Sequence, residues 1–356
     1  MNLGTTFPQW VDAATMTNLR LSVTGVENIK GGSGNDVLTG DANDNIFIGN
    51  GGNDSIGGGG GSDTVDYNAT TAGITLTRNS TTFQMTGSEV DTDTLSGIFT
   101  IIGGSGNDAF AIDADSLTSE SYDIQGGSGS DLINFALTAS ALAVNLSILA
   151  AQSVVTGKLT LTLSGIENVT GGSTNNTLTG DDNANILTGG AGIDVINAGL
   201  GNDTLYGGLG ANNLNGGEGS DWVNYNASSS DVTVSLAITT AQTTWSTASD
   251  TLSNIENIIG SAFADTLTGD ANDNILRGGL GGDILTGGGS GDNDTVDYSD
   301  ASVAVTVNLA TSTMSGADAV DVISNFESVI GSAYNDTLTG DANANQLTGG
   351  SGNDTL

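Results

Sequence analysis

The chain has 356 residues and carries 41 acidic against 5 basic side chains, for a net charge of -36. Nucleic-acid binding requires clustered Lys and Arg that displace phosphate counterions, so this composition excludes it, and an acidic membrane surface would repel the chain. The chain has no Cys and no His, which excludes disulfides, thiolate sites and the most frequent general base.

Residues 1–30 form the first predicted segment, which we expect to lead into the repeats that follow and to cap them. Residues 1–20 lack both the basic start and the continuous apolar region of a Sec signal peptide, so we expect no such signal. No apolar run approaches the roughly 20 residues that span a bilayer, so we expect no membrane insertion.

From residue 31 onward the chain contains nine-residue units. Residues 31–66 divide into GGSGNDVLT, GDANDNIFI, GNGGNDSIG and GGGGSDTVD, with Asp or Asn at position six and an apolar residue at position eight. Glycine at positions one, two and four permits a tight turn, and the last three residues suit a very short strand with one inward side chain. Because one unit cannot bury that side chain alone, the repeat predicts an all-β solenoid of stacked units.

The units are grouped in five arrays, which strand-rich connectors separate. The predicted segments after residue 30 are 31–67 (array 1), 68–102 (β connector), 103–135 (degenerate array 2), 136–170 (β connector), 171–225 (array 3), 226–259 (β connector), 260–298 (array 4), 299–330 (β connector) and 331–356 (array 5, truncated). Since the sequence stops within a unit, we expect further repeats or domains beyond Leu356 in the natural protein.

Two kinds of residue mark the array boundaries. Three arrays close with a tyrosine, at Tyr67, Tyr225 and Tyr298, which we expect to seal the array ends. A glutamate recurs shortly before four of the arrays, at Glu27, Glu167, Glu256 and Glu327. We expect these glutamates to be caps or acceptors of backbone hydrogen bonds and not catalytic groups.

The stacked turns require a cation. Without one, carboxylates would repeat at about the 4.8 Å spacing of neighbouring strands, an arrangement that like-charge repulsion opposes. Calcium prefers six to eight oxygen ligands, and Asp carboxylates together with the carbonyls of glycine-rich turns supply that chemistry. The sequence therefore predicts calcium as the bound ion.

The run GGSGND and its copies resemble the RTX, or haemolysin-type calcium-binding, nonapeptide GGxGxDxUx. The resemblance implies a right-handed parallel β-roll with two units per coil and with calcium between turns two units apart. It pairs Asp36 with Asp54, Asn45 with Asp63, Asn185 with Asp203, Asp194 with Asn212, Asp203 with Asp221, and Asp265 with Asp283. We expect up to about nine calcium ions on this basis.

The metal ligands that the resemblance implies are the sixth-position side chains and nearby turn carbonyls. The side chains are Asp36, Asn45, Asp54, Asp63, Asp108, Asp131, Asn185, Asp194, Asp203, Asn212, Asp221, Asp265, Asn274, Asp283, Asp294, Asp336 and Asp354. The carbonyls are those of Gly32, Gly34, Gly49, Gly51, Gly190, Gly192, Gly207 and Leu209. No catalytic residue and no other cofactor is predicted.

Some units depart from the motif. Where Asn replaces Asp at position six, we expect weaker sites, because the amide is a neutral ligand. Position four is Asn at residues 43, 183, 272 and 343, and we expect these residues to take the left-handed conformation, which Asn tolerates. Phe263 and Tyr334 occupy position four in the first units of their arrays, where we expect them to cap the roll.

The resemblance implies a secreted, extracellular protein of the bacterial cell surface that leaves the cell unfolded by type I secretion and folds on calcium binding. We expect a structural or adhesive role, as a surface layer, matrix, filament or adhesin segment, and no enzyme activity. The expected partners are calcium and either copies of the chain itself or surface polysaccharide. Two alternatives stay open: the RTX region of a secreted enzyme whose catalytic domain lies elsewhere, and a carbohydrate-binding module.

Overall fold

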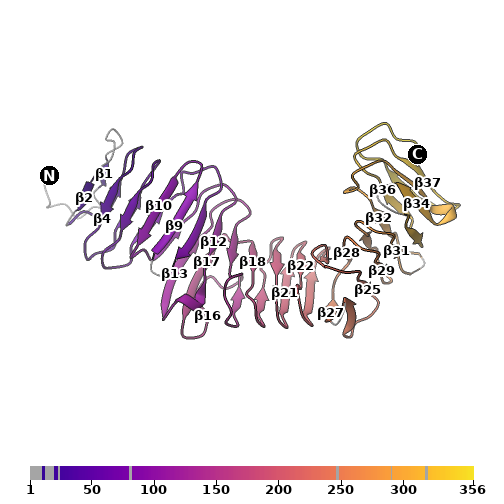
Figure 1. The fold of residues 1–356 in the computed structure, drawn as a ribbon, viewed down its shortest axis with the longest axis horizontal. Helices are drawn as coiled ribbons and strands as arrows, with labels where there is room; N and C mark the ends of the chain where they lie inside the picture. Colours follow the sequence, from indigo (N-terminus) through magenta and orange to yellow (C-terminus); the bar gives the residue numbers. More distant parts are fainter. Residues whose placement is uncertain are drawn as a thin grey trace. The chain divides into compact units, whose positions relative to one another are not determined.

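The computed structural model describes residues 10–12, 20–22, 25–79, 82–245, 248–289, 291–316 and 320–356. The chain divides into two compact units, Met1–Ser173 and Thr174–Leu356. Both are built almost entirely from very short strands joined by tight turns (Figure 1).

The strands of the N-terminal unit are β1 (Trp10–Asp12), β2 (Arg20–Ser22), β3 (Asn28–Lys30), β4 (Val37–Thr39), β5 (Ile46–Ile48), β6 (Ser55–Gly57), β7 (Thr64–Asp66), β8 (Thr75–Asn79), β9 (Thr82–Gly87), β10 (Asp91–Ser96), β11 (Thr100–Ile102), β12 (Ala109–Ala111), β13 (Glu120–Gln125), β14 (Leu132–Asn134), β15 (Ala143–Asn145), β16 (Gln152–Val155), β17 (Leu159–Ser164) and β18 (Asn168–Thr170). One 3-10 turn, η1 (Ala114–Ser116), follows β12.

The strands of the C-terminal unit are β19 (Thr177–Thr179), β20 (Ile186–Thr188), β21 (Val195–Leu200), β22 (Thr204–Tyr206), β23 (Asn213–Glu218), β24 (Trp222–Asn224), β25 (Thr233–Ser235), β26 (Gln242–Trp245), β27 (Ala248–Ser253), β28 (Asn257–Ile259), β29 (Thr266–Thr268), β30 (Ile275–Arg277), β31 (Ile284–Thr286), β32 (Thr295–Asp297), β33 (Val305–Asn308), β34 (Thr313–Gly316), β35 (Val322–Ser324), β36 (Ser328–Ile330), β37 (Thr337–Thr339) and β38 (Gln346–Thr348). A 3-10 turn, η2 (Leu309–Thr311), follows β33.

Array strands pair in parallel with the strand two units further along the chain. β3 pairs with β5 and β5 with β7 in one sheet, whereas β4 pairs with β6 in another. The register joins Leu38 to Ile56, which are 18 residues apart, so two nonapeptides form one coil as predicted. The same spacing recurs in the C-terminal unit, where Leu178 pairs with Ile196.

The predicted connectors continue these sheets. β11 pairs with array strand β7, and β10 pairs with array strand β6, both in parallel. Antiparallel hairpins extend several connectors, for example β9 against β8 and β10, and β33 against β34. Arrays and connectors therefore share the same stacks within each unit.

The core is a row of single apolar side chains, one from each strand. In the sheet that contains β3, the residues Ile29, Phe47, Val65, Ile101 and Ile124 follow one another in register, and all are fully buried. Burial of one such side chain contributes about 1.5–3 kcal/mol. Since each is covered by the coils on either side, a coil is stable only within a stack.

The predicted all-β fold, a parallel β-roll solenoid, is confirmed. The expected capping role of Phe263 and Tyr334 is wrong, because their units lie inside the stack: β29 lies between β25 and β31, and β37 pairs with β33. Both aromatic side chains are exposed instead. Within the described residues, no helix has the length and apolarity needed to cross a membrane.

Candidate metal-binding turns

The sixth-position side chains form ladders of hydrogen bonds that run from coil to coil. The backbone N–H of Asp36 donates to Oδ1 of Asp54 at 2.8 Å, and that of Asn45 donates to Oδ1 of Asp63 at 2.8 Å. The other four predicted pairs are joined by the same bond at 2.7–3.0 Å. The structure therefore brings together each of the six predicted pairs.

Two further pairs of predicted ligands, which were not among the six predicted pairs, are joined in the same way by a backbone N–H and an Oδ1 atom. Asp108 donates to Asp131 at 2.7 Å, and Asp336 donates to Asp354 at 2.9 Å. In the fourth array a two-residue insertion lengthens the step, yet the N–H of Asn274 still reaches Oδ1 of Asp294 at 2.9 Å.

The first turn of most ladders closes on itself. In the turn of Asp36, Oδ2 accepts the Gly32 N–H at 2.6 Å, so the carboxylate is held inside its own unit. We call this arrangement a closed turn. The predicted ligands that occupy closed turns are Asp36, Asn45, Asp108, Asn185, Asp265, Asn274 and Asp336.

The asparagines of closed turns make further bonds within the protein. Nδ2 of Asn45 donates to the Val26 carbonyl, and Nδ2 of Asn274 donates to the Glu256 carbonyl, both at 2.9 Å. Nδ2 of Asn185 donates to Asp181 at 3.2 Å. These side chains, predicted as weak ligands, thus serve in this structure as protein-bonded turn caps.

The position-four asparagines also differ from expectation. Asn43 donates from its backbone N–H and from its side-chain amide to Asp41, and Asn183, Asn272 and Asn343 repeat this turn. None of the four has a positive φ, so the expected left-handed conformation is wrong. Asn50, at position two of its unit, takes it instead, with a φ of 68°.

The later turns leave one carboxylate oxygen without a partner. In the turn of Asp54, Asn50 and Gly52 have positive φ, Oδ1 belongs to the ladder, and Oδ2 is buried without a hydrogen bond. We call this arrangement an open turn. The residues with such an Oδ2 are Asp54, Asp63, Asp131, Asp194, Asp203, Asp221, Asp283 and Asp294.

Several unpartnered oxygens face a carbonyl oxygen across a small space. A Cβ placed on Gly189 would lie 2.5 Å from Oδ2 of Asp194 and 2.6 Å from the carbonyl oxygen of Gly207. A Cβ on Gly58 would lie 2.2 Å from Oδ2 of Asp63 and 2.3 Å from the Gly97 carbonyl oxygen. In these two turns, glycine at position one therefore keeps open a space between two oxygens of the kind that calcium prefers. In the turn of Asp203, position one is Ala198.

The predicted carbonyl ligands are distributed over these turns. Besides Gly207, the carbonyl of Gly49 lies beside the α-carbon of Gly31 near Oδ2 of Asp36. Those of Gly34 and Gly192 lie against the α-carbons of Gly52 and Gly210, and the Gly190 carbonyl accepts the Leu209 N–H at 2.8 Å. Gly32, Gly51 and Leu209 belong to the same turns, at positions two and three.

Burial governs the electrostatics of the open turns. It raises the pKa of Asp54 and of Asp283 to about 7, and the neighbouring Asp93 and Asp321 carboxylates add to these two increases. Burial likewise raises the pKa of Asp131, Asp194, Asp203 and Asp294 to about 6. A divalent cation between the turns would remove this penalty, because it favours the ionised carboxylates.

The last N–H of a ladder is accepted either by a glutamate or by an aspartate, and only the glutamates were predicted as acceptors. The glutamates end one kind: Oε2 of Glu167, Glu256 and Glu327 accepts the N–H of Asp131, Asp221 and Asp294 at 2.8–3.1 Å. The predicted role as a backbone acceptor is confirmed for these three. For Glu27, the structure gives the backbone carbonyl as the acceptor of the Ile46 N–H.

The other ladder end uses residues that sequence reasoning missed. Asp93, Asp250 and Asp321 accept the N–H of Asp54, Asn212 and Asp283 through Oδ1, and their Oδ2 accepts a tyrosine hydroxyl. They lie in connectors, outside the nonapeptide pattern. The sequence did contain a signal for two of them. Asp250 and Asp321 lie six residues before the recurrent glutamates Glu256 and Glu327, and Asp93 lies at the same distance before Phe99.

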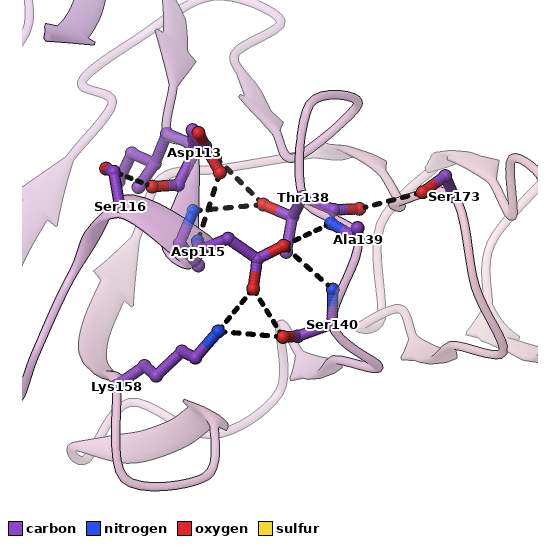
Figure 2. A network of polar contacts seen from close by, with 10 residues as sticks. Asp113, Asp115, Ser116, Thr138, Ala139, Ser140, Lys158 and Ser173 are labelled. Carbon is purple, nitrogen blue, oxygen red and sulfur yellow. Dashed lines mark hydrogen bonds and ion pairs between the residues drawn. The ribbon is translucent and has the colours of Figure 1, made fainter. Parts of the chain in front are cut away.

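A junction in the N-terminal unit links neighbouring turns through the side chains of Asp115 and Lys158. Asp115, in η1, accepts the N–H groups of Ala139 and Ser140, and Lys158 binds both Asp115 and the Ser140 hydroxyl (Figure 2). The Lys158 ammonium holds the pKa of Asp115 below its ordinary value. Although a serine beside a lysine resembles a nucleophile with its base, this lysine is ion-paired with Asp115, so the network is a structural link.

The comparison with known families agrees with this geometry. The family model for the RTX calcium-binding nonapeptide repeat (4 copies) matches residues 24–68, 162–196, 188–223, 251–285 and 324–356. No curated protein sequence matches the chain. The chain belongs to the RTX repeat family, and its repeats are calcium-binding repeats.

Proposed function

We propose that this chain is a structural or adhesive segment of an extracellular protein, that calcium ions stiffen its stacked coils, and that it is not an enzyme. The observation that carries the proposal is the unpartnered, buried Oδ2 that recurs in eight open turns among the described residues. When bound, calcium neutralises these carboxylates and joins them to carbonyl oxygens of the adjacent coil.

The same turns make folding depend on calcium. Without the ion, each open turn buries a carboxylate oxygen, Oδ2, that lacks a hydrogen-bond donor, and this opposes folding. In extracellular calcium the free energy of binding adds to the stability of the fold. Dissociation constants of about 10⁻⁴ to 10⁻³ M, typical of extracellular modules, would keep the chain unfolded inside the cell and folded outside.

This dependence suits type I secretion to the bacterial cell surface, in which an unfolded chain crosses the envelope and folds on arrival. A stiffened solenoid with many ions suits a load-bearing layer, filament or adhesin stalk. Support comes from the continuity of the stacks, because hairpins and connectors extend the same sheets within each unit.

The test is a calcium titration of the purified chain, followed by far-UV circular dichroism, with magnesium as the control ion. We expect cooperative gain of β-structure with calcium and little with magnesium, whose geometry is stricter. A spectrum that chelator leaves unchanged would contradict calcium-dependent folding. Electron microscopy of calcium-loaded native material tests the structural role, and isolated particles attached to a catalytic domain would favour a secreted enzyme instead.

A further inference from the structure

One ladder end carries a third carboxylate that the repeat does not provide. Asp292, Asp294 and Glu327 each place a carboxylate oxygen within 4.8 Å of the others, the one such group of three among the described residues. Asp294 holds the sixth position of its unit, and Glu327 caps it. Asp292 lies two residues before Asp294, within the lengthened turn of the fourth array.

Two comparable ladder ends lack this third group. Glu167 caps Asp131 and Glu256 caps Asp221 in the same manner, at 2.8 and 2.9 Å. The residue two positions before each aspartate is a glycine there, Gly129 or Gly219. Asp292 is therefore the difference between the fourth array and its two counterparts.

Three carboxylate oxygens of this cluster are buried and unpartnered. Oδ2 of the fully buried Asp294 has no hydrogen bond, and neither oxygen of Asp292 has one, although all three atoms are shielded from solvent. An added Cβ on Gly287 would lie 2.6 Å from Oδ2 of Asp294 and 1.9 Å from the Asn325 carbonyl oxygen. A carbonyl oxygen thus lies near the Asp294 carboxylate.

The protein fixes these groups firmly. The Asp294 carbonyl accepts the N–H groups of Glu327 and Ser328 at 3.1 and 2.9 Å, and its N–H donates to Glu327. On the other side, the Asn293 N–H donates to Asp273 at 2.8 Å. A solvent-open hollow of about 580 Å³, lined by Asp273 and Asp292 among others, gives a hydrated ion access to the cluster.

We propose that Asp292 and Glu327 turn the open turn of Asp294 into a three-carboxylate cation site that binds calcium more tightly than the other open turns do. Three carboxylates and a carbonyl are hard oxygen ligands, and calcium affinity rises with the number of charged ligands in a site. The choice of calcium rests on the proposed function, whereas the position of the site rests on the cluster itself. The ion would join the fourth array to the segment that leads into the fifth.

The test is a calcium titration of the full chain against a competing chromophoric chelator, which counts ions and ranks their affinities. We expect D292N and E327Q each to weaken the tightest site by about tenfold or more, because each removes a charged ligand. E327Q retains an oxygen that can accept the Asp294 N–H. E256Q, at the matched ladder end without a third carboxylate, should leave the tightest site unchanged.

The outcomes separate this proposal from the one on which it rests. If the wild type binds calcium and both variants bind it with unchanged number and affinity, the three-carboxylate site is refuted while calcium binding by the repeats stands. If the wild type binds no calcium, the proposed function fails, and the calcium site fails with it. Should a variant not fold in millimolar calcium, anomalous diffraction from terbium-soaked wild-type crystals decides: density among the three carboxylates supports the site, and its absence there overturns it.

Discussion

The hydroxyl of Tyr67 donates a 2.8 Å hydrogen bond to Oδ2 of Asp93, and the Asp54 N–H occupies the other oxygen of that carboxylate. Both oxygens of Asp93 are thereby used by protein groups. The pairs Tyr225–Asp250 and Tyr298–Asp321 repeat the arrangement at 3.1 Å. A tyrosine thus takes the place at the ladder end that we assign to a metal ion in the open turns.

Replacing Tyr67 by Phe should destabilise the calcium-loaded protein by about 1–3 kcal/mol, because it leaves a buried carboxylate oxygen without a donor. Thermal unfolding in excess calcium measures the effect. Tyr206→Phe is the control, since that hydroxyl is partly exposed and only accepts a bond from Asn224. Equal losses in the two variants would show that the Tyr67 hydroxyl has no special role.

Replacing Asp54 by Asn should weaken calcium binding more than Asp36→Asn does. Oδ2 of Asp54 is unpartnered, whereas Oδ2 of Asp36 already accepts the Gly32 N–H. In chelator we expect D54N to be the more stable of the two variants. It removes a buried charge and should stabilise the metal-free fold by about 1–3 kcal/mol. Calorimetric calcium titration and urea unfolding in chelator check the two parts. Identical calcium midpoints for both variants would refute the distinction between open and closed turns.

Acid should stabilise the metal-free fold. Burial raises the pKa of Asp54 and Asp283 to about 7, above the ordinary 3.8, so the folded chain binds more protons than the unfolded one. Their contribution is fully present below the ordinary pKa and is lost as the pH rises through about 7. Circular dichroism in chelator should show more β-structure at about pH 5 than at about pH 8. The reverse order would contradict the assignment.

The space beside position-one glycine can be filled directly. An alanine Cβ at Gly189 would lie between Oδ2 of Asp194 and the Gly207 carbonyl oxygen, so G189A should raise the calcium concentration needed for folding by about tenfold or more. G57A is the matched control, because its Cβ would meet its nearest atom only at 3.5 Å, and neither glycine has a positive φ. A calcium midpoint equal to that of G57A would place the ion elsewhere.

The nonapeptide period predicted the coil and its core because both depend on spacing alone. Position eight is apolar wherever a strand points inward, and a coil of two units follows from pairing at 18 residues, as between Leu38 and Ile56. The pairing of Asp36 with Asp54 follows from the same register.

The distinction between closed and open turns could not be predicted in this way. Asp36 and Asp54 each end a Gly-Asn-Asp run. What separates their turns is the backbone conformation at positions two and four, which has a positive φ only in the turn of Asp54 and which both glycine and asparagine can adopt. Asp93 was missed because its strand belongs to a connector, and only folding brings it beside Asp54.

The most direct test of calcium as the link between coils is a crystal structure of the calcium-loaded chain with anomalous data. The account predicts ions beside the unpartnered Oδ2 atoms of open turns such as those of Asp54, Asp194 and Asp221, and no ion at Asp93 where Tyr67 is bound. Open turns without ions in crystals grown from millimolar calcium would contradict it.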